Sequence, residues 1–145
     1  MNTTLQTIFA KHKGKAGALL PILHDIQHEL GYVPDEAVPP IAQEFNLSRA
    51  EVHGVITYYH HFRRTPPGKH VVQVCCAEAC QANGSEALAA HAAKRLQDED
   101  VTLEPTYCLG LCSIGPAVAV NETELHARVT PKKFDALMNG LGDKK

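Results

Sequence analysis

Five cysteines, all between residues 75 and 112, are the residues of this sequence whose type and spacing could do chemistry. Cys75 and Cys80 form a C-x4-C pair, and Cys108 and Cys112 form a C-x3-C pair. Thiolates are soft ligands that suit iron–sulfur clusters and zinc. The odd number of cysteines and the lack of a C-x-x-C motif argue against a disulfide framework and a dithiol redox site. The pattern therefore indicates ligation of a metal or a cluster.

Two pairs of thiolates from two loops can complete the tetrahedra of both irons in a [2Fe–2S] cluster. Structural zinc sites accept similar spacings. The apolar segment 108–116 (CLGLCSIGP) favours the cluster, because Gly110 can bring backbone N–H groups close to sulfur and the leucines and Ile114 can exclude water. From the residues alone we expect one [2Fe–2S] cluster, with a zinc-stabilised interaction module as the alternative. The expected ligands are Cys75, Cys80, Cys108 and Cys112.

The fifth cysteine, Cys76, adjoins an expected ligand and could in principle replace it. Successive side chains in a strand point to opposite faces, so Cys75 and Cys76 should point apart. We therefore expect Cys76 to be a buried free thiol.

The residues before the first cysteine predict helices. Residues 16–30 carry leucines and an isoleucine at helical spacing, and Gly31 provides a stop. Residues 34–45 predict a second helix, which Pro39-Pro40 could interrupt. Ser48 and Glu51 form a capping-box pattern that begins a third helix, running to about residue 59.

The residues after the Pro66-Pro67-Gly68 turn predict a different architecture, in the order β-α-β-β-β-α. A strand–helix–strand unit followed by a hairpin and a helix is typical of a compact thioredoxin-like layer. We expect a helical bundle or docking domain over residues 1–66 and a thioredoxin-like domain over residues 67–145. The predicted strands are 70–74, 101–107, 117–120 and 125–129, and the predicted helices are 85–96 and 131–138.

Charge and hydropathy exclude some classes of partner. The formal net charge is −2 and the isoelectric point is near 6.5, which gives no electrostatic reason to expect a nucleic acid or an anionic membrane. No secretory signal and no apolar run long enough to cross a bilayer are recognisable. We expect a cytoplasmic protein without membrane insertion, in a compartment that keeps thiols reduced.

The cysteine pattern closely resembles that of thioredoxin-like [2Fe–2S] ferredoxins. It reads C-x4-C, then 27 residues, then C-L-G-x-C with a Gly-Pro shortly after. This family includes the 24-kDa subunit of NADH dehydrogenase, subunits of NAD(P)-linked hydrogenases and the gamma subunit of NAD-dependent molybdenum formate dehydrogenases. The helical half matches through GYVP at 31–34 and VHGVITYY at 52–59. The runs HHFR at 60–63, CCAEACQ at 75–81 and YCLGLCS at 107–113 look most like the formate dehydrogenase gamma subunit.

The resemblance implies an α+β protein, with a small helical bundle followed by a thioredoxin-like β-α-β-β-β-α domain. It implies an electron-transfer subunit whose single [2Fe–2S] cluster lies next to the FMN of an NAD-linked formate dehydrogenase complex. Such a complex converts formate and NAD⁺ to CO₂ and NADH. The equivalent subunit of a respiratory NADH dehydrogenase or of an NAD(P)-linked hydrogenase is the alternative.

The implied partners are a beta-type subunit with FMN, the NAD site and a [4Fe–4S] cluster, and an alpha-type subunit with the molybdenum cofactor. Further iron–sulfur clusters would connect these centres. Catalysis would belong to those subunits, and we expect no catalytic residue in this chain. The sequence agrees, because it contains neither G-x-G-x-x-G nor G-x-x-x-x-G-K-[ST].

Overall fold

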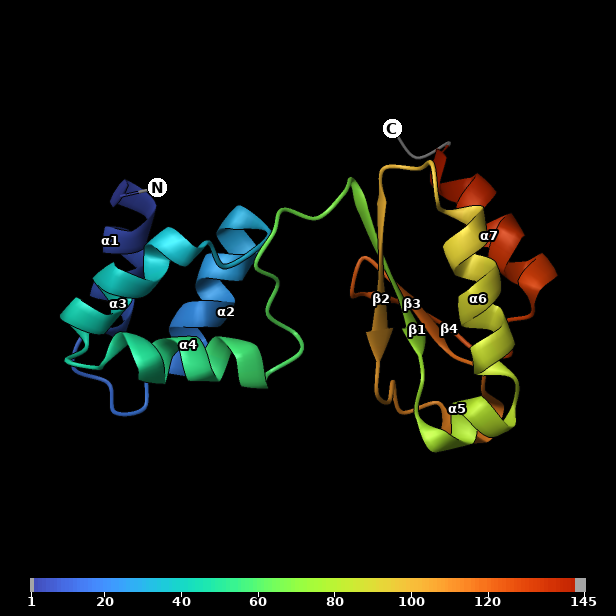
Figure 1. Ribbon diagram of the computed structural model, residues 1–145, viewed down its shortest axis with the longest axis horizontal. Helices are drawn as coiled ribbons and strands as arrows, with labels where there is room; N and C mark the ends of the chain where they lie inside the picture. The colour runs from blue at the N-terminus through green and yellow to red at the C-terminus, as the bar shows by residue number, and fades with distance from the viewer. Residues whose placement is uncertain (1, 143–145) are drawn as a thin grey trace. The chain divides into compact units, whose positions relative to one another are not determined.

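The computed structural model describes residues 2–142, and the chain divides between Pro67 and Gly68 into two units (Figure 1). The first unit is helical, and the second contains the whole β-sheet. Each unit has its own hydrophobic core.

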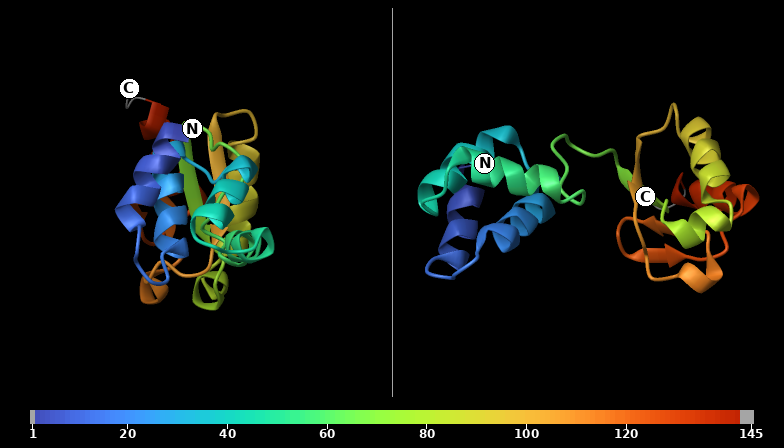
Figure 2. Two further views of the ribbon diagram at one scale, coloured as in Figure 1. Left: turned by 90° about the vertical axis from the view of Figure 1, so that its left-hand side faces the viewer. Right: turned by 60° about the horizontal axis from the view of Figure 1, so that its bottom comes forward.

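The helical unit consists of four α-helices and one 3-10 helix within the described residues. Helices α1 and α2 lie side by side (Figure 2), and α3 packs on α4. Helix α1 was not predicted from the sequence, because only Leu5, Ile8 and Phe9 mark its buried side. Packing on α2 therefore stabilises a helix whose own pattern is weak. The elements are α1 (Asn2–His12), α2 (Leu19–Leu30), η1 (Asp35–Ala37), α3 (Val38–Glu44) and α4 (Arg49–Tyr58).

The ends of these helices follow local sequence signals. Gly31 ends α2 in the left-handed conformation, with φ of 82°, and its N–H donates to Gln27 O at 2.7 Å. The predicted capping box at the start of α4 is confirmed: Glu51 N donates to Ser48 Oγ at 3.1 Å, and Ser48 N donates to Glu51 Oε2 at 2.7 Å.

The prolines at 39 and 40 do not interrupt the second predicted helix. They lie in the first turn of α3, where a helix needs no backbone N–H donors from its own residues. The preceding residues form the short η1 helix instead. The expectation of an interruption was wrong, because these prolines help to begin the α-helix.

The second unit has a four-stranded sheet in the order β2-β1-β3-β4. Strands β1 and β2 are parallel, whereas β3 is antiparallel to both β1 and β4. Figure 1 shows α6 and α7 covering one face of this sheet and α5 lying at the end where β1 and β2 finish. The elements are β1 (His70–Cys75), α5 (Glu78–Ala82), α6 (Ser85–Arg95), β2 (Val101–Thr106), η2 (Cys112–Ile114), β3 (Val118–Val120), β4 (Glu124–His126) and α7 (Pro131–Gly142).

The core of this unit lies between the sheet and its two long helices. Val72 and Val74 of β1 and the valines of β3 point toward Leu88 of α6 and Phe134 of α7, all nearly fully buried. The protein is α+β and thioredoxin-like, as predicted. Strand β4 is shorter than the predicted 125–129, because Arg128 adopts the left-handed conformation, with φ of 48°, and leaves the sheet.

No helix within residues 2–142 is long and apolar enough to cross a bilayer.

Candidate functional site

The four expected ligands lie at one end of the sheet, because β1 and β2 are parallel and their carboxyl ends lie side by side. Cys75 is the last residue of β1 and pairs with Thr106, the last residue of β2. Cys76 N donates to Thr106 O at 2.7 Å, and Cys75 N donates to Ala117 O at 3.0 Å. These bonds hold the two loops that follow the strands next to each other.

The first pair, Cys75 and Cys80, is buried. Their exposed fractions are 1% and 2%, and Ala117 packs against them. Cys80 is in the short helix α5, which begins three residues after β1 ends. Burial, followed by a hydrogen bond to Cys75, raises the pKa of the Cys80 thiol above its ordinary value.

The second pair, Cys108 and Cys112, is exposed and is held by an irregular loop. Their sulfur atoms are 3.5 Å apart. Gly110, with φ of 75°, donates its N–H to Cys108 Sγ at 3.3 Å. The backbone hydrogen bond from Gly110, followed by a side-chain hydrogen bond with Cys112, lowers the pKa of the Cys108 thiol. The same side-chain hydrogen bond raises the pKa of the Cys112 thiol.

The loop that carries the second pair packs on the first pair. Leu109 and Leu111 lie against the buried Cys75 and Cys80, and a Cβ on Gly115 would lie 3.0 Å from Cys80 Sγ. Two sulfurs bound to one tetrahedral metal at about 2.3 Å lie roughly 3.8 Å apart. The 3.5 Å separation of Cys108 and Cys112 fits such a pair. The donor set, with two thiols from each loop, therefore fits a dinuclear cluster with one pair on each iron.

Among residues 2–142, no three or more His, Cys, Asp or Glu side chains are arranged to hold one metal ion.

Cys76 points away from the other four cysteines, as the alternation in β1 predicts. It faces the helix-covered side of the sheet, beside Val74, Ala89 and Leu103. The thiol is half-buried and donates to Val74 O at 3.4 Å. Burial, and then the neighbouring Cys75, raises the pKa of this thiol. Cys76 is therefore less buried than expected, and its side chain points away from the two cysteine pairs.

The apolar residues of the second loop protect only one of the two pairs. Leu109 and Leu111 pack around the buried Cys75 and Cys80. They leave Cys108 and Cys112 exposed, and Ile114 is half-buried. The expectation that this loop would keep water from the whole site was thus only partly right, since it covers the facing pair and not its own.

Two residues that sequence reasoning did not single out shape the site. A Cβ atom on Gly115 would lie 3.0 Å from Cys80 Sγ and 3.4 Å from Cys80 Cα, so glycine allows this close approach. Arg128 donates its backbone N–H to Ile114 O at 2.8 Å, which ties the segment after β4 to the second cysteine loop. The Gly-Pro at 115–116 was a local sequence signal for a role of Gly115, whereas no local pattern indicated the role of Arg128.

Side chains also stabilise the first cysteine loop. Gln81 Nε2 donates to Cys76 O at 2.7 Å, and Asn83 Nδ2 donates to Ala79 O at 2.6 Å. The second bond satisfies a carbonyl group of the short helix α5, and the first joins that helix to the residue that follows β1.

Comparisons with known proteins identify the class. A family model described as thioredoxin-like [2Fe-2S] ferredoxin matches residues 5–142. One subunit of the NADH-quinone oxidoreductase of Escherichia coli (strain K12) is 34% identical over 129 residues, which cover 83% of this chain and 77% of that protein. This chain therefore belongs to the thioredoxin-like [2Fe–2S] ferredoxin family, and the family supports one [2Fe–2S] cluster.

Two further relatives come from hydrogenases. The NADP-reducing hydrogenase subunit HndA of Solidesulfovibrio fructosivorans is 32% identical over 133 residues, covering 86% of this chain and 77% of that one. The fold resembles a crystal structure of an NAD⁺-reducing [NiFe]-hydrogenase in the H₂-reduced state, with a TM-score of 0.71 and 23% identity. That match covers 90% of this chain but only 23% of the hydrogenase chain, so it establishes the fold alone.

Proposed function

We propose that this chain is the electron-transfer subunit of an NAD-linked oxidoreductase complex and carries one [2Fe–2S] cluster on Cys75, Cys80, Cys108 and Cys112. When bound, such a cluster takes up and releases one electron at a time. The observation that carries the proposal is the position of two cysteine pairs at the end of the sheet where the parallel strands β1 and β2 finish. The chain's own residues position four thiolates and leave one pair open to a partner.

The two pairs have different tasks in this proposal. Cys75 and Cys80 lie among buried residues and anchor the cluster to the fold. The Gly110 N–H stabilises negative charge on Cys108, on the exposed side through which electrons would enter and leave. Catalysis on a substrate belongs to partner subunits.

We further propose that the complex is a formate dehydrogenase in which the chain lies beside the FMN of a beta-type subunit. The support is the likeness of residues 60–63, 75–81 and 107–113 to the gamma subunit of such enzymes. The partners would be that subunit, with FMN, NAD and a [4Fe–4S] cluster, and a molybdenum-containing alpha-type subunit. A cytoplasmic location follows for such a complex.

The second candidate is the equivalent subunit of an NADH dehydrogenase or an NAD(P)-linked hydrogenase. It is favoured by the names of the relatives, an NADH-quinone oxidoreductase subunit and an NADP-reducing hydrogenase subunit. Both candidates assign the same role to this chain and differ in the subunit that oxidises the substrate.

The helical unit is the proposed docking domain. Tyr58, at the end of α4, is 75% exposed, and the adjacent Tyr59 is 42% exposed, with the two rings 5.0 Å apart. Exposed aromatic residues are enriched in protein–protein interfaces, because they bury a large area at little cost in conformational entropy.

Affinity purification of the tagged full-length chain from its own cells tests both levels of the proposal. We expect a red-brown chain with two irons and two sulfides that bleaches with dithionite, together with a flavoprotein and a molybdenum-containing subunit that oxidises formate. A colourless chain that contains zinc would contradict the cluster. Recovery with quinone-reducing or nickel-containing subunits would reject formate dehydrogenase and leave the electron-transfer role intact.

A further inference from the structure

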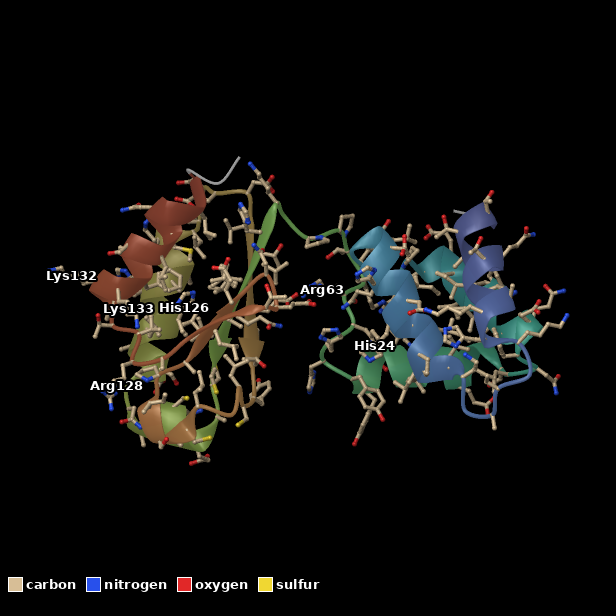
Figure 3. All side chains as sticks on the ribbon, turned by 180° about the vertical axis from the view of Figure 1, so that it is seen from behind. His24, Arg63, His126, Arg128, Lys132 and Lys133 are labelled. Carbon is tan, nitrogen blue, oxygen red and sulfur yellow. The ribbon has the colours of Figure 1, made fainter. Side chains whose placement is uncertain are left out.

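The residues that follow β4, up to the first turn of α7, carry a group of positive charges, and their first part is bonded to the loop of the exposed cysteine pair. Residues 126–133 read HARVTPKK and contain three permanent cations and a histidine but no acidic residue, in a chain whose net charge is −2. We call Arg128, Lys132 and Lys133 the cationic strip, and all three are exposed. Figure 3 shows the three residues on one side of the unit, with Arg128 toward the end where η2 lies.

Backbone hydrogen bonds fix the strip to the second cysteine loop. Arg128 N donates to Ile114 O at 2.8 Å, and Val129 N donates to Pro116 O at 3.0 Å. Ile114 is the last residue of η2, which begins at Cys112. Arg128 is therefore held next to the loop that carries an exposed cysteine.

The lysines of the strip do not serve the helix in which they lie. Lys132 and Lys133 are in the first turn of α7, where the helix dipole disfavours positive charge and where no acidic residue is present. Lys133 Nζ binds Ala127 O at 2.7 Å, a contact that directs its charge to the same segment. Lys133 thus has a contact within the fold, whereas the exposed Lys132 is a cation at a position that the helix disfavours.

Two acidic groups of this unit, Asp135 and Glu124, interact with residues of the unit itself. Asp135 accepts from His91 at 2.7 Å and lies 3.9 Å from Arg95, both on α6. Glu124 lies 3.9 Å from the His126 ring. Glu78 is on the other cysteine loop, at the start of α5.

Charge in this unit is distributed unequally along the sheet. The acidic run 98–100 immediately precedes β2, whereas the cysteine pairs lie where β2 ends. The acidic run and Arg128 are thus associated with opposite ends of the sheet, which would orient the unit in the field of a charged partner.

We propose that the cationic strip docks an acidic protein surface of the redox partner and so brings that partner to the exposed cysteine pair. This inference rests on the proposed function. Three cations on a chain with net negative charge are too few to hold a nucleic acid or a membrane at physiological salt. Arg128 is bonded through its backbone to the short helix that begins at Cys112, and this position suits a protein that exchanges electrons at the exposed pair.

The first experiment measures the electric field at the cluster of the full-length chain without a partner. Dithionite-reduced protein is mixed in a stopped-flow instrument with ferricyanide, an anion that accepts one electron, or with hexaammineruthenium(III), a cation that does the same. The test variant is R128Q/K132Q/K133Q, and K13Q/K69Q/K94Q is the charge-matched control with exposed lysines elsewhere.

At low salt we expect the test variant to react roughly tenfold more slowly with ferricyanide and faster with the cation. The control should change less than about twofold, and about 1 M salt should remove the differences, since the Debye length is then about 3 Å. Equal rates for the test variant and the parent, or equal effects of both triple variants, would overturn the inference.

The second experiment uses the flavoprotein that co-purifies with the chain. A carbodiimide joins lysine amines to carboxylates in contact with them, and mass spectrometry locates the links. We expect Lys132 or Lys133 to be joined to Asp or Glu of the flavoprotein. Links made only by lysines outside the strip would overturn the docking surface while leaving the proposed function intact. A chain without iron would overturn the proposed function, and the docking surface with it.

Discussion

The two cysteine pairs of this protein are alike in sequence and different in structure. Cys75 and Cys80 come from a strand end and a short helix and are 1% and 2% exposed. Cys108 comes from an irregular loop and Cys112 begins the short helix η2, and both are open to solvent. Regular elements and core packing position the first pair, whereas backbone hydrogen bonds and unusual φ angles position the second.

We infer from this difference that the two cysteine pairs contribute differently to the stability of the fold and to binding of the cluster. The buried pair is part of a hydrophobic core, so a change there should affect folding as well as binding. The exposed pair contributes little to packing, so a change there should affect the bound cluster alone. In order of decreasing expected effect, three experiments test this comparison directly, and a fourth tests the helical unit.

The largest effect is expected from replacing one cysteine of each pair. Cys80→Ser and Cys108→Ser should both lose most of the cluster, because each removes one of four thiolates. Only Cys80→Ser should also destabilise the metal-free chain, by about 1–3 kcal/mol, since it places a hydroxyl in a buried apolar position. Iron and sulfide content and urea unfolding of the metal-free proteins check both expectations. Equal destabilisation by the two variants would contradict the division.

A smaller effect is expected from crowding the buried pair. In Gly115→Ala the new Cβ would lie 3.0 Å from Cys80 Sγ, so the sulfur or the loop must shift. We expect a loss of about 1–3 kcal/mol in stability and a lower cluster content. Gly140→Ala is the control, because its Cβ would meet nothing within 4 Å and alanine favours a helix. A Gly115→Ala protein with full iron content and unchanged stability would disprove the close approach.

The exposed pair can be tested through its backbone. Gly110→Ala keeps open space around the new Cβ but forces alanine to a φ of 75°. The cost of about 1–2 kcal/mol should loosen the loop and speed removal of iron by a chelator. Gly84→Ala provides a similar strain, at φ of 93°, before α6. It should lower stability without speeding iron removal, and equal rates in the two variants would argue against a special role for Gly110.

The smallest effect is expected in the helical unit, where Asp25 accepts hydrogen bonds from Lys11 and His12 at 2.8 and 2.7 Å. The bond from Lys11, followed by that from His12, holds the pKa of this carboxyl below its ordinary value. Because the pKa is lower in the folded chain, the stabilisation is present above the unfolded value of about 4 and is lost as pH falls through the folded value.

Asp25→Asn should therefore cost about 0.5 kcal/mol at neutral pH and nothing in strong acid, with the iron content unchanged. Thermal unfolding as a function of pH measures the difference between the variant and the parent protein. A difference that persists in acid would show that packing, and not charge, accounts for the effect.

Local signals were sufficient for much of the fold. The capping box at Ser48, the stop at Gly31 and the order of the four strands and two long helices after Gly68 were predictable, because each depends on residues close in sequence. The short helix α5, which carries Cys80, was not predicted, since that segment was expected to be a loop. Helix α1 escaped prediction because its stability comes from packing on α2. The left-handed Arg128 shortened β4, and no local pattern marks an arginine for that conformation.

For the site, the sequence by itself predicted four thiols in two pairs as the ligands, with a glycine that could bring its N–H close to sulfur, and the structure shows the Gly110 N–H donating to Cys108 Sγ. Spacing alone could not decide which pair is buried. The parallel pairing of β1 with β2, the contact of Gly115 with Cys80 and the attachment of Arg128 to Ile114 decided that. These are contacts between residues far apart in the chain, so only the folded structure brings their effects together.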